Sequence, residues 1–266
     1  MTSANQRCGV NLFLAFIRRD ISIEKTYRFH LALKICGILL QMVIFYFISV
    51  YMGKPEYFPF VFVGIMFSSY FQFWLNVFSE NIRQEQYWGT MEKVFLSPIQ
   101  PLIVIAASAS GKFMIVIMET AAMILVGKLF FGAGFAGVFS ILAVFIPILV
   151  LNALVFGGIG LISGSFIMYF KRGDPVNWVI GASFDLLSGV FFPVAVFPDL
   201  LKGLAEKLPT TMALNMWRTI LLDGNVPVLH DWLVLAGWAT VLCGFGILSF
   251  KISFDKTRIK GELGSY

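Results

Sequence analysis

Charged residues are scarce in this sequence of 266 residues. Asp, Glu, Lys and Arg together make up 13% of the chain, whereas soluble domains carry about 25%. Hydrophobic residues make up 58%, and the mean hydropathy is +0.83. These values exclude an ordinary water-soluble globular protein and predict an all-α membrane protein.

Cysteine and histidine are also rare. The three cysteines, Cys8, Cys36 and Cys243, have no paired spacing, and His30 and His230 lie near opposite ends of the chain. We therefore expect neither a disulfide framework nor a metal site. Since no Ser or Cys stands in a recognisable nucleophile motif, we expect no catalytic residues.

A phosphate-binding loop is missing as well. ATP-hydrolysing subunits carry a glycine-rich loop that ends in Lys followed by Ser or Thr. The nearest fragments are GKF at residues 111–113 and GKL at residues 127–129, and neither has this pattern. We therefore expect a chain that is not an enzyme and that holds no cofactor of its own.

Long apolar runs are what the sequence has in abundance. A helix needs about 20 mainly apolar residues to cross a bilayer, and Pro, Gly and charged residues separate such runs here. The pattern predicts a single transmembrane domain over residues 31–252 with about six spans. These spans are residues 31–52, 57–78, 113–131, 138–170, 176–191 and 232–250.

The basic residues predict the orientation. With both termini in the cytoplasm, 15 of the 20 Lys and Arg residues lie inside, as the positive-inside rule requires. The five left outside are Lys54, Lys128, Lys202, Lys207 and Arg218. This clustering at membrane edges accounts for the net charge of +5, so we expect no nucleic-acid partner.

The segments outside the spans have patterns of their own. Residues 1–30 include apolar residues at helical spacing from Val10 to Ile21, which predicts an amphipathic helix on the membrane surface. Residues 84–97 form a second amphipathic pattern, on the cytoplasmic side. Residues 192–222 contain prolines and charged residues, which favour a re-entrant hairpin of two short helices. Residues 253–266 form a basic cytoplasmic tail.

Several polar residues and glycines fall inside predicted spans. Glu119 and Asp185 suggest a transport pathway, although protonation or a basic neighbour such as Lys112 or Lys128 could neutralise them. Asn152 is expected to hydrogen-bond across the bundle. A small-residue pair, Gly160 and Gly164, indicates close helix packing, either within the chain or at a dimer seam.

The order of these elements resembles the permeases of type-2 ABC exporters over nearly the whole chain. The resemblance is carried by RQEQYWGTME at residues 83–92 with Ser97 and Pro98 behind it, by KRGDP at residues 171–175, and by GVFFP at residues 189–193. It continues in Phe197-Pro198, in Leu208-Pro209, and in Arg218 with Gly224.

The resemblance implies a permease dimer, homomeric or heteromeric, in contact with membrane lipid and two copies of an ABC ATPase subunit that binds ATP and Mg²⁺. It also implies that the helix at residues 84–97 is a coupling helix that docks on the ATPase. The hairpin would be an outer gate. The implied coupling residues are Glu85, Tyr87, Gly89, Thr90, Met91, Glu92 and Phe95, and the pathway and gate candidates are Glu119, Asn152, Asp185, Phe192, Pro193, Phe197 and Pro198.

The favoured function is ATP-driven export of hydrophobic, amphipathic or lipid-linked cargo across the plasma (inner) membrane. Export of a polysaccharide or lipid-linked glycan is the alternative within the family. Two alternatives belong to other classes, namely an ion-coupled secondary transporter that uses Glu119 and Asp185 as proton carriers, and a membrane assembly scaffold.

Overall fold

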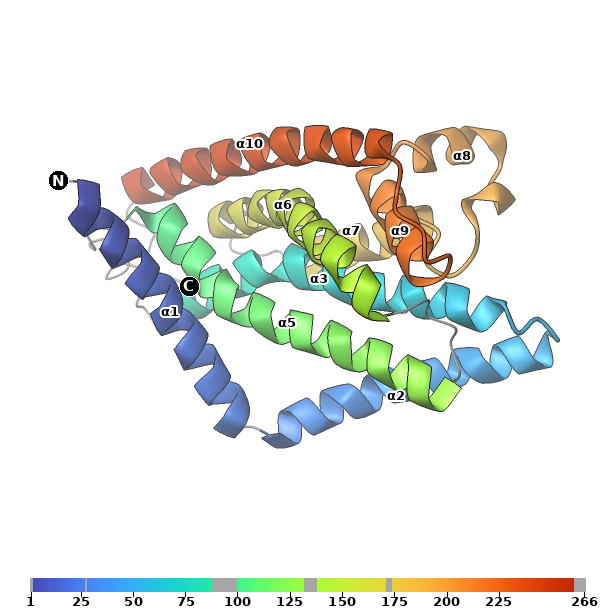
Figure 1. The fold of residues 1–266 in the computed structure, drawn as a ribbon. Helices are drawn as coiled ribbons and strands as arrows, with labels where there is room; N and C mark the ends of the chain where they lie inside the picture. Colours follow the sequence, from blue (N-terminus) through green and yellow to red (C-terminus); the bar gives the residue numbers. More distant parts are fainter. Residues whose placement is uncertain (1, 27, 88–99, 132–137, 171–173, 261–266) are drawn as a thin grey trace.

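The computed structural model describes residues 2–26, 28–87, 100–131, 138–170 and 174–260. Within these ranges the fold consists of helices and connecting turns, with no strand (Figure 1). In chain order the elements are α1 (Thr2–Thr26), α2 (Arg28–Tyr51), α3 (Tyr57–Tyr87), α5 (Pro101–Phe131), α6 (Val138–Phe170), α7 (Asp174–Leu187), the 3-10 helix η1 (Val194–Val196), α8 (Asp199–Ala205), α9 (Pro209–Leu221) and α10 (Leu229–Lys260).

Four described helices are long and apolar enough to cross a membrane. Their qualifying stretches are Tyr57–Glu85, Pro101–Lys128, Ala143–Phe170 and Leu229–Ile259. Each contains most or all of a predicted span, so the all-helical prediction is confirmed and four of the six spans have a matching helix. These candidate spans lie in α3, α5, α6 and α10.

The other two predicted spans lie in α2 and α7, which are not among these four helices. In α2 the described apolar stretch is Leu39–Tyr51. Helix α7 has 14 residues, which extend for about 21 Å at the usual rise and fall short of a hydrocarbon core of about 30 Å. The count of six spans therefore stays a prediction.

Helix α5 begins earlier than the third predicted span. It starts at Pro101, a residue type that suits the first turn because its missing N–H has no helical partner there. The small polar residues that follow lie within the helix, and their hydroxyls are satisfied by its own carbonyls. Ser108 donates to the Ile105 carbonyl at 2.8 Å and Ser110 to the Ala107 carbonyl at 2.6 Å.

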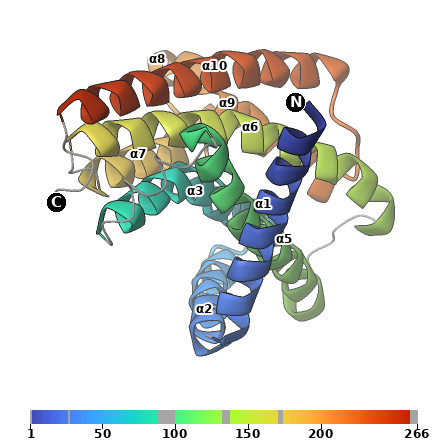
Figure 2. The same ribbon diagram turned by 90° about the vertical axis from the view of Figure 1, so that its left-hand side faces the viewer.

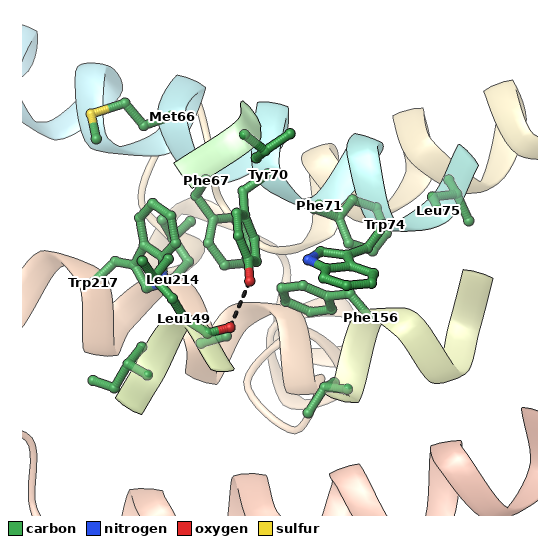
Figure 3. Packing of buried hydrophobic residues seen from close by; sticks show 14 of the residues in the cluster. Met66, Phe67, Tyr70, Phe71, Trp74, Leu75, Leu149, Phe156, Leu214 and Trp217 are labelled. Carbon is green, nitrogen blue, oxygen red and sulfur yellow. Dashed lines mark hydrogen bonds between the residues drawn. The ribbon is translucent and has the colours of Figure 1, made fainter. Parts of the chain in front are cut away.

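The core is built around α3. Its central residues are buried against α6 and α9, and Figure 3 shows the aromatic rings that fill this space. The ring of Trp217 on α9 packs edge-on against Phe145 of α6 and Phe67 of α3, at centroid distances of 4.9 and 5.5 Å. The Tyr70 hydroxyl donates to the Leu149 carbonyl at 2.6 Å, so the one polar atom of this ring is satisfied.

Glycines allow α6 to approach α3 on one side and α10 on the other. A Cβ at Gly160 would overlap the Trp74 carbonyl oxygen of α3, and one at Gly164 would lie 3.2 Å from Ile82. Toward α10, a Cβ at Gly158 would lie 2.6 Å from the Leu242 carbonyl carbon. The pair of Gly160 and Gly164 therefore packs within the chain, and α6 and α10 run side by side in Figures 1 and 2.

Candidate transport site

The predicted coupling segment begins at the end of α3. The helix continues through Tyr87, so residues 84–87, including Glu85, form its last turn. Gly89, Thr90, Met91, Glu92 and Phe95 lie outside the described residues. What the structure describes is the pair of helices, α3 and α5, on either side of residues 88–99.

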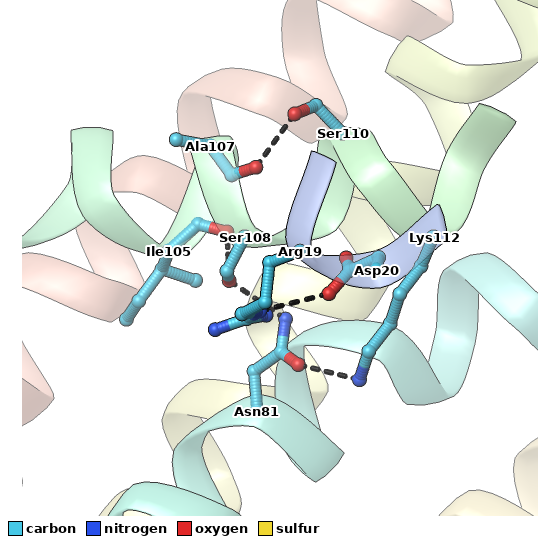
Figure 4. Close-up of polar contacts among 8 residues, drawn as sticks. All are labelled: Arg19, Asp20, Asn81, Ile105, Ala107, Ser108, Ser110 and Lys112. Carbon is cyan, nitrogen blue, oxygen red and sulfur yellow. Dashed lines mark hydrogen bonds and ion pairs between the residues drawn. The ribbon is translucent and has the colours of Figure 1, made fainter. Parts of the chain in front are cut away.

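A polar joint connects these two helices near the segment (Figure 4). The Lys112 ammonium of α5 donates to the Asn81 side-chain oxygen of α3 at 2.6 Å. The Asn81 amide in turn donates to the Ser108 hydroxyl at 2.8 Å. Lys112 thus forms a hydrogen bond to the neighbouring helix.

The N-terminal helix α1 joins this cluster through Asp20. Asp20 is buried, accepts a hydrogen bond from the Arg19 guanidinium at 2.9 Å, and has a second carboxylate oxygen with no hydrogen-bond partner among the described residues. That oxygen lies where a Cβ of Gly111 would stand, and the Phe16 carbonyl is 2.9 Å from the same point. Gly111 is therefore the position at which α1 can sit against α5.

We expect Gly111→Ala to push α1 away from α5, because the new methyl group would meet a buried carboxylate and a backbone carbonyl. Overpacking of this kind costs about 1–3 kcal/mol, so the midpoint of thermal unfolding in detergent should fall. Gly37→Ala on α2, where a Cβ would meet nothing within 4 Å, is the matched control. Equal midpoints for both variants would show that the α1–α5 contact does not need glycine.

A cavity of about 370 Å³ lies between α3 and α5. This volume falls in the range of about 300–1,000 Å³ that is typical of small-molecule sites. The cavity contains Glu119, one of the two acids predicted for a pathway. Its lining residues are Ser69, Tyr70, Gln72, Phe73, Asn76 and Glu80 from α3, and Val116, Glu119, Thr120 and Met123 from α5.

The second predicted acid, Asp185 of α7, reaches the same stretch of α3. Its carboxylate accepts a hydrogen bond from the Gln72 amide at 3.3 Å, and a Cβ at Gly181 of α7 would overlap that amide. Gln72 also lines the cavity that holds Glu119. Gln72 therefore bonds to one predicted acid and lines the cavity that the other acid also lines, although the two acids are 66 positions apart in the sequence.

Neutral polar side chains connect α3, α6 and α7 next to this cavity. The Asn177 amide of α7 donates to the Asn76 side-chain oxygen at 2.9 Å, and the Ser163 hydroxyl of α6 bonds to the Asn177 side-chain oxygen. The hydroxyl oxygens of Ser163 and Ser79 are 3.2 Å apart, within hydrogen-bond distance. Sequence reasoning did not single out Gln72 or Asn76. Their helical spacing with Ser69 and Glu80 inside an apolar span was the available signal.

The side chain of Asn152 does not form the hydrogen bond that was predicted for it. Its side chain is fully buried, and neither its amide nitrogen nor its oxygen has a hydrogen-bond partner among the described residues. The expected bond across the bundle is therefore wrong. Asn152 lies between Leu149 and Phe156, one turn away on either side, and both of those residues belong to the apolar core around α3. The helices there present aromatic and aliphatic groups instead of a polar partner.

Residues 192–222 contain two short helices, α8 and α9, and the re-entrant placement of this hairpin stays a prediction. Phe192 and Phe197 pack edge-to-face at 5.4 Å, which closes the turn around η1. Pro193 and Pro198 are the residues immediately before η1 and α8, where their fixed backbone angle suits a helix start. These four gate candidates lie together between α7 and α9.

Arg218 of α9 binds the backbone just before this hairpin. Arg218 was counted only among the external basic residues in the sequence, which did not predict this role. Its guanidinium donates to the Gly189 carbonyl at 2.8 Å and the Val190 carbonyl at 3.3 Å, and lies 3.6 Å from the centroid of the Phe60 ring. Gly189 ends α7 with a φ of +76°, a conformation that favours glycine. The Tyr57 hydroxyl bonds to the next carbonyl, that of Phe191, at 3.1 Å.

Comparison with known proteins adds one finding to this geometry. The family model described as ABC-2 type transporter matches residues 11–222. The matched region runs from α1 to the end of α9, which is well over half of the chain, and it includes the polar joint, the cavity and the hairpin. No curated protein matches the sequence.

Proposed function

The chain belongs to the ABC-2 type transporter family, and from this premise we propose that it is the membrane subunit of an ATP-driven exporter. It is a multi-pass permease of the ABC type and not a catalytic chain. The proposed cargo is hydrophobic, amphipathic or lipid-linked, and export of a polysaccharide or lipid-linked glycan is the second candidate within the family. Two ATPase subunits, which bind ATP and Mg²⁺, would supply the energy to a dimer of permeases in the inner membrane.

The family match carries this proposal, and the junction of α3 and α5 supports it. In this proposal residues 84–97 dock on the ATPase, on the cytoplasmic side with both termini. The Lys112–Asn81–Ser108 bonds join the helices that flank this segment, and Asp20 brings α1 onto the same joint. A push on the segment would then move α1, α3 and α5 together, and α3 carries one wall of the cavity.

Docking can be tested by truncating two of the proposed coupling residues. An interface anchor contributes about 2 kcal/mol or more, so Glu92→Ala and Phe95→Ala are each expected to weaken ATPase binding about thirtyfold. The measurement is titration of the purified, tagged permease with the purified ATPase subunit in detergent. Glu56→Ala, between α2 and α3, and Phe245→Ala, on the exposed face of α10, are the matched controls.

Unchanged affinity in both coupling variants would contradict docking through this segment. The proposal as a whole has a separate test in sealed vesicles. Cargo movement by the purified chain without any ATPase subunit would favour the ion-coupled alternative, in which Glu119 and Asp185 carry protons. Absence of cargo-dependent ATPase stimulation in the assembled complex would favour the scaffold alternative.

A further inference from the structure

Helices α6 and α10 are parallel and end at the same side of the bundle (Figure 2). The Cys243 thiol of α10 donates to the Leu154 carbonyl of α6 at 3.1 Å. Further along both helices, the Lys256 ammonium of α10 lies 5.7 Å from the centroid of the Tyr169 ring of α6. Residue numbers therefore increase in the same direction along the two helices. Their carboxyl-terminal ends meet one leaflet of the membrane, which is the cytoplasmic leaflet in the predicted orientation.

Lys256 lies at the depth of the lipid headgroups. Tyr169 is the second-last residue of the predicted span 138–170, and Lys256 follows the last residue of the predicted span 232–250 by six positions, about 9 Å along the helix axis. The headgroup layer is about 5–7 Å thick on each side of the hydrocarbon core. Side chains of a helix lean toward its N-terminus, which for Lys256 is the direction of the membrane. The Lys256 ammonium is therefore placed among phosphate groups.

Exposed apolar side chains lie beside this cation. On α6, the Phe170 ring is 55% exposed and packs against the rings of Phe166 at 4.3 Å and Tyr169 at 5.0 Å between centroids. Phe166, one turn closer to the membrane centre, is also exposed. On α10, Ile252 is exposed one turn before Lys256. The surface is therefore apolar on its membrane side and cationic at its edge, as in segments that contact both acyl chains and headgroups.

Positive charge predominates at this end of α10. Lys251, Lys256 and Arg258 are exposed, and so is one acid, Asp255. Asp255 is four positions from Lys251 and three from Arg258, so the helical spacing places it beside those two residues, whereas neighbours in sequence such as Asp255 and Lys256 do not face each other. The Tyr169 ring orients the Lys256 ammonium without neutralising its charge. This surface therefore suits an anionic group on an apolar body.

We propose that the ends of α6 and α10 bind an anionic phospholipid, with its phosphate at the Lys256 ammonium and an acyl chain along Phe166 and Phe170. A zwitterionic lipid fits less well, because its ammonium group would bring a further positive charge to this surface. The ligand is a component of the membrane and not the cargo. The site shares no residue with the cavity between α3 and α5 or with the proposed coupling segment, so the inference goes beyond the export function.

Competition between two lipids that differ in headgroup charge tests the proposal. We expect the purified, delipidated chain in detergent to bind dioleoylphosphatidylglycerol in preference to dioleoylphosphatidylcholine when native mass spectrometry follows a titration with both. One basic residue near the membrane surface strengthens anionic lipid binding about fivefold, so Lys256→Gln should reduce this preference about fivefold. Lys256→Arg should keep it. Lys207→Gln, at an exposed basic residue of the hairpin, is the matched control and should leave the preference unchanged.

A measurement on the unaltered chain distinguishes a lipid from a soluble phosphate. Glycerol 3-phosphate, which carries the phosphate without acyl chains, should not displace the bound phosphatidylglycerol at millimolar concentrations. Displacement by this compound, or the same lipid preference in the native chain and in Lys256→Gln, would overturn the proposal, and the second result would mean that Lys256 serves only the end of α6. These experiments use the permease without ATPase or cargo, so their failure is distinct from a failure of the export function.

Discussion

Arg218→Ala is expected to lower the free energy of unfolding by about 4 kcal/mol, since it orphans two buried carbonyls, removes a cation–π contact and leaves a cavity. The carbonyls are those of the buried residues Gly189 and Val190, and the ring is that of Phe60. Thermal unfolding of the purified chain in detergent measures the loss. Lys207→Ala, at an exposed basic residue of the same hairpin, should have little effect.

Two further variants separate the contributions of Arg218. Arg218→Met restores most of the side-chain volume and also relieves the cost of burying a charge, so it should recover part of the stability. It cannot donate to the two carbonyls. Arg218→Lys keeps the charge but loses the Nη2 nitrogen that donates to both carbonyls and the planar guanidinium that lies over the Phe60 ring. We therefore expect an intermediate midpoint.

The location of the damage is a second readout. Hydrogen exchange should increase in residues 189–198 of the Arg218→Ala variant before it increases in α3 or α6, because the guanidinium anchors that turn to α9. A midpoint equal to that of the native chain, or faster exchange spread evenly over all helices, would contradict the anchoring role.

Arg218 also shows what the sequence could and could not predict. Counting basic residues placed it on the external side of the membrane, and that count holds no information on whether the side chain is buried. Its partners are backbone carbonyls and a ring from residues 189–190 and Phe60, contacts between distant parts of the chain. Local periodicity holds no information about such contacts. The neighbouring residues Leu214, Trp217 and Leu221, all buried, were the sign that this helix is not a solvated loop.

The helices themselves were largely predictable, since apolar length and the breaks at glycine, proline and charge are local properties. The hairpin's two short helices followed from the same reasoning. Asn152 shows the limit of this approach. Its position in a predicted span favoured a hydrogen bond across the bundle, but such a bond also requires a polar group on the facing helix. Which residues that helix turns toward Asn152 is determined by tertiary packing.

Helix packing is the basis of the other prediction with a large effect. Gly160→Ala is expected to destabilise the fold by about 3 kcal/mol, because the methyl group would overlap a backbone oxygen of α3, which cannot move as a flexible side chain can. The whole of α6 would have to shift away from Trp74. The measurement is again the midpoint of thermal unfolding in detergent.

Helix α10 offers a matched pair of glycines for the same argument. A Cβ at Gly246 would lie 2.7 Å from the Gly158 carbonyl oxygen of α6, whereas one at Gly244 would meet nothing within 4 Å. Gly246→Ala should therefore lower the unfolding midpoint. Gly244→Ala should raise it, because alanine is the better helix former by about 0.5–1 kcal/mol. Changes of the same sign at both positions would mean that helix propensity, and not the close approach of α6 and α10, determines the effect of glycine in this bundle.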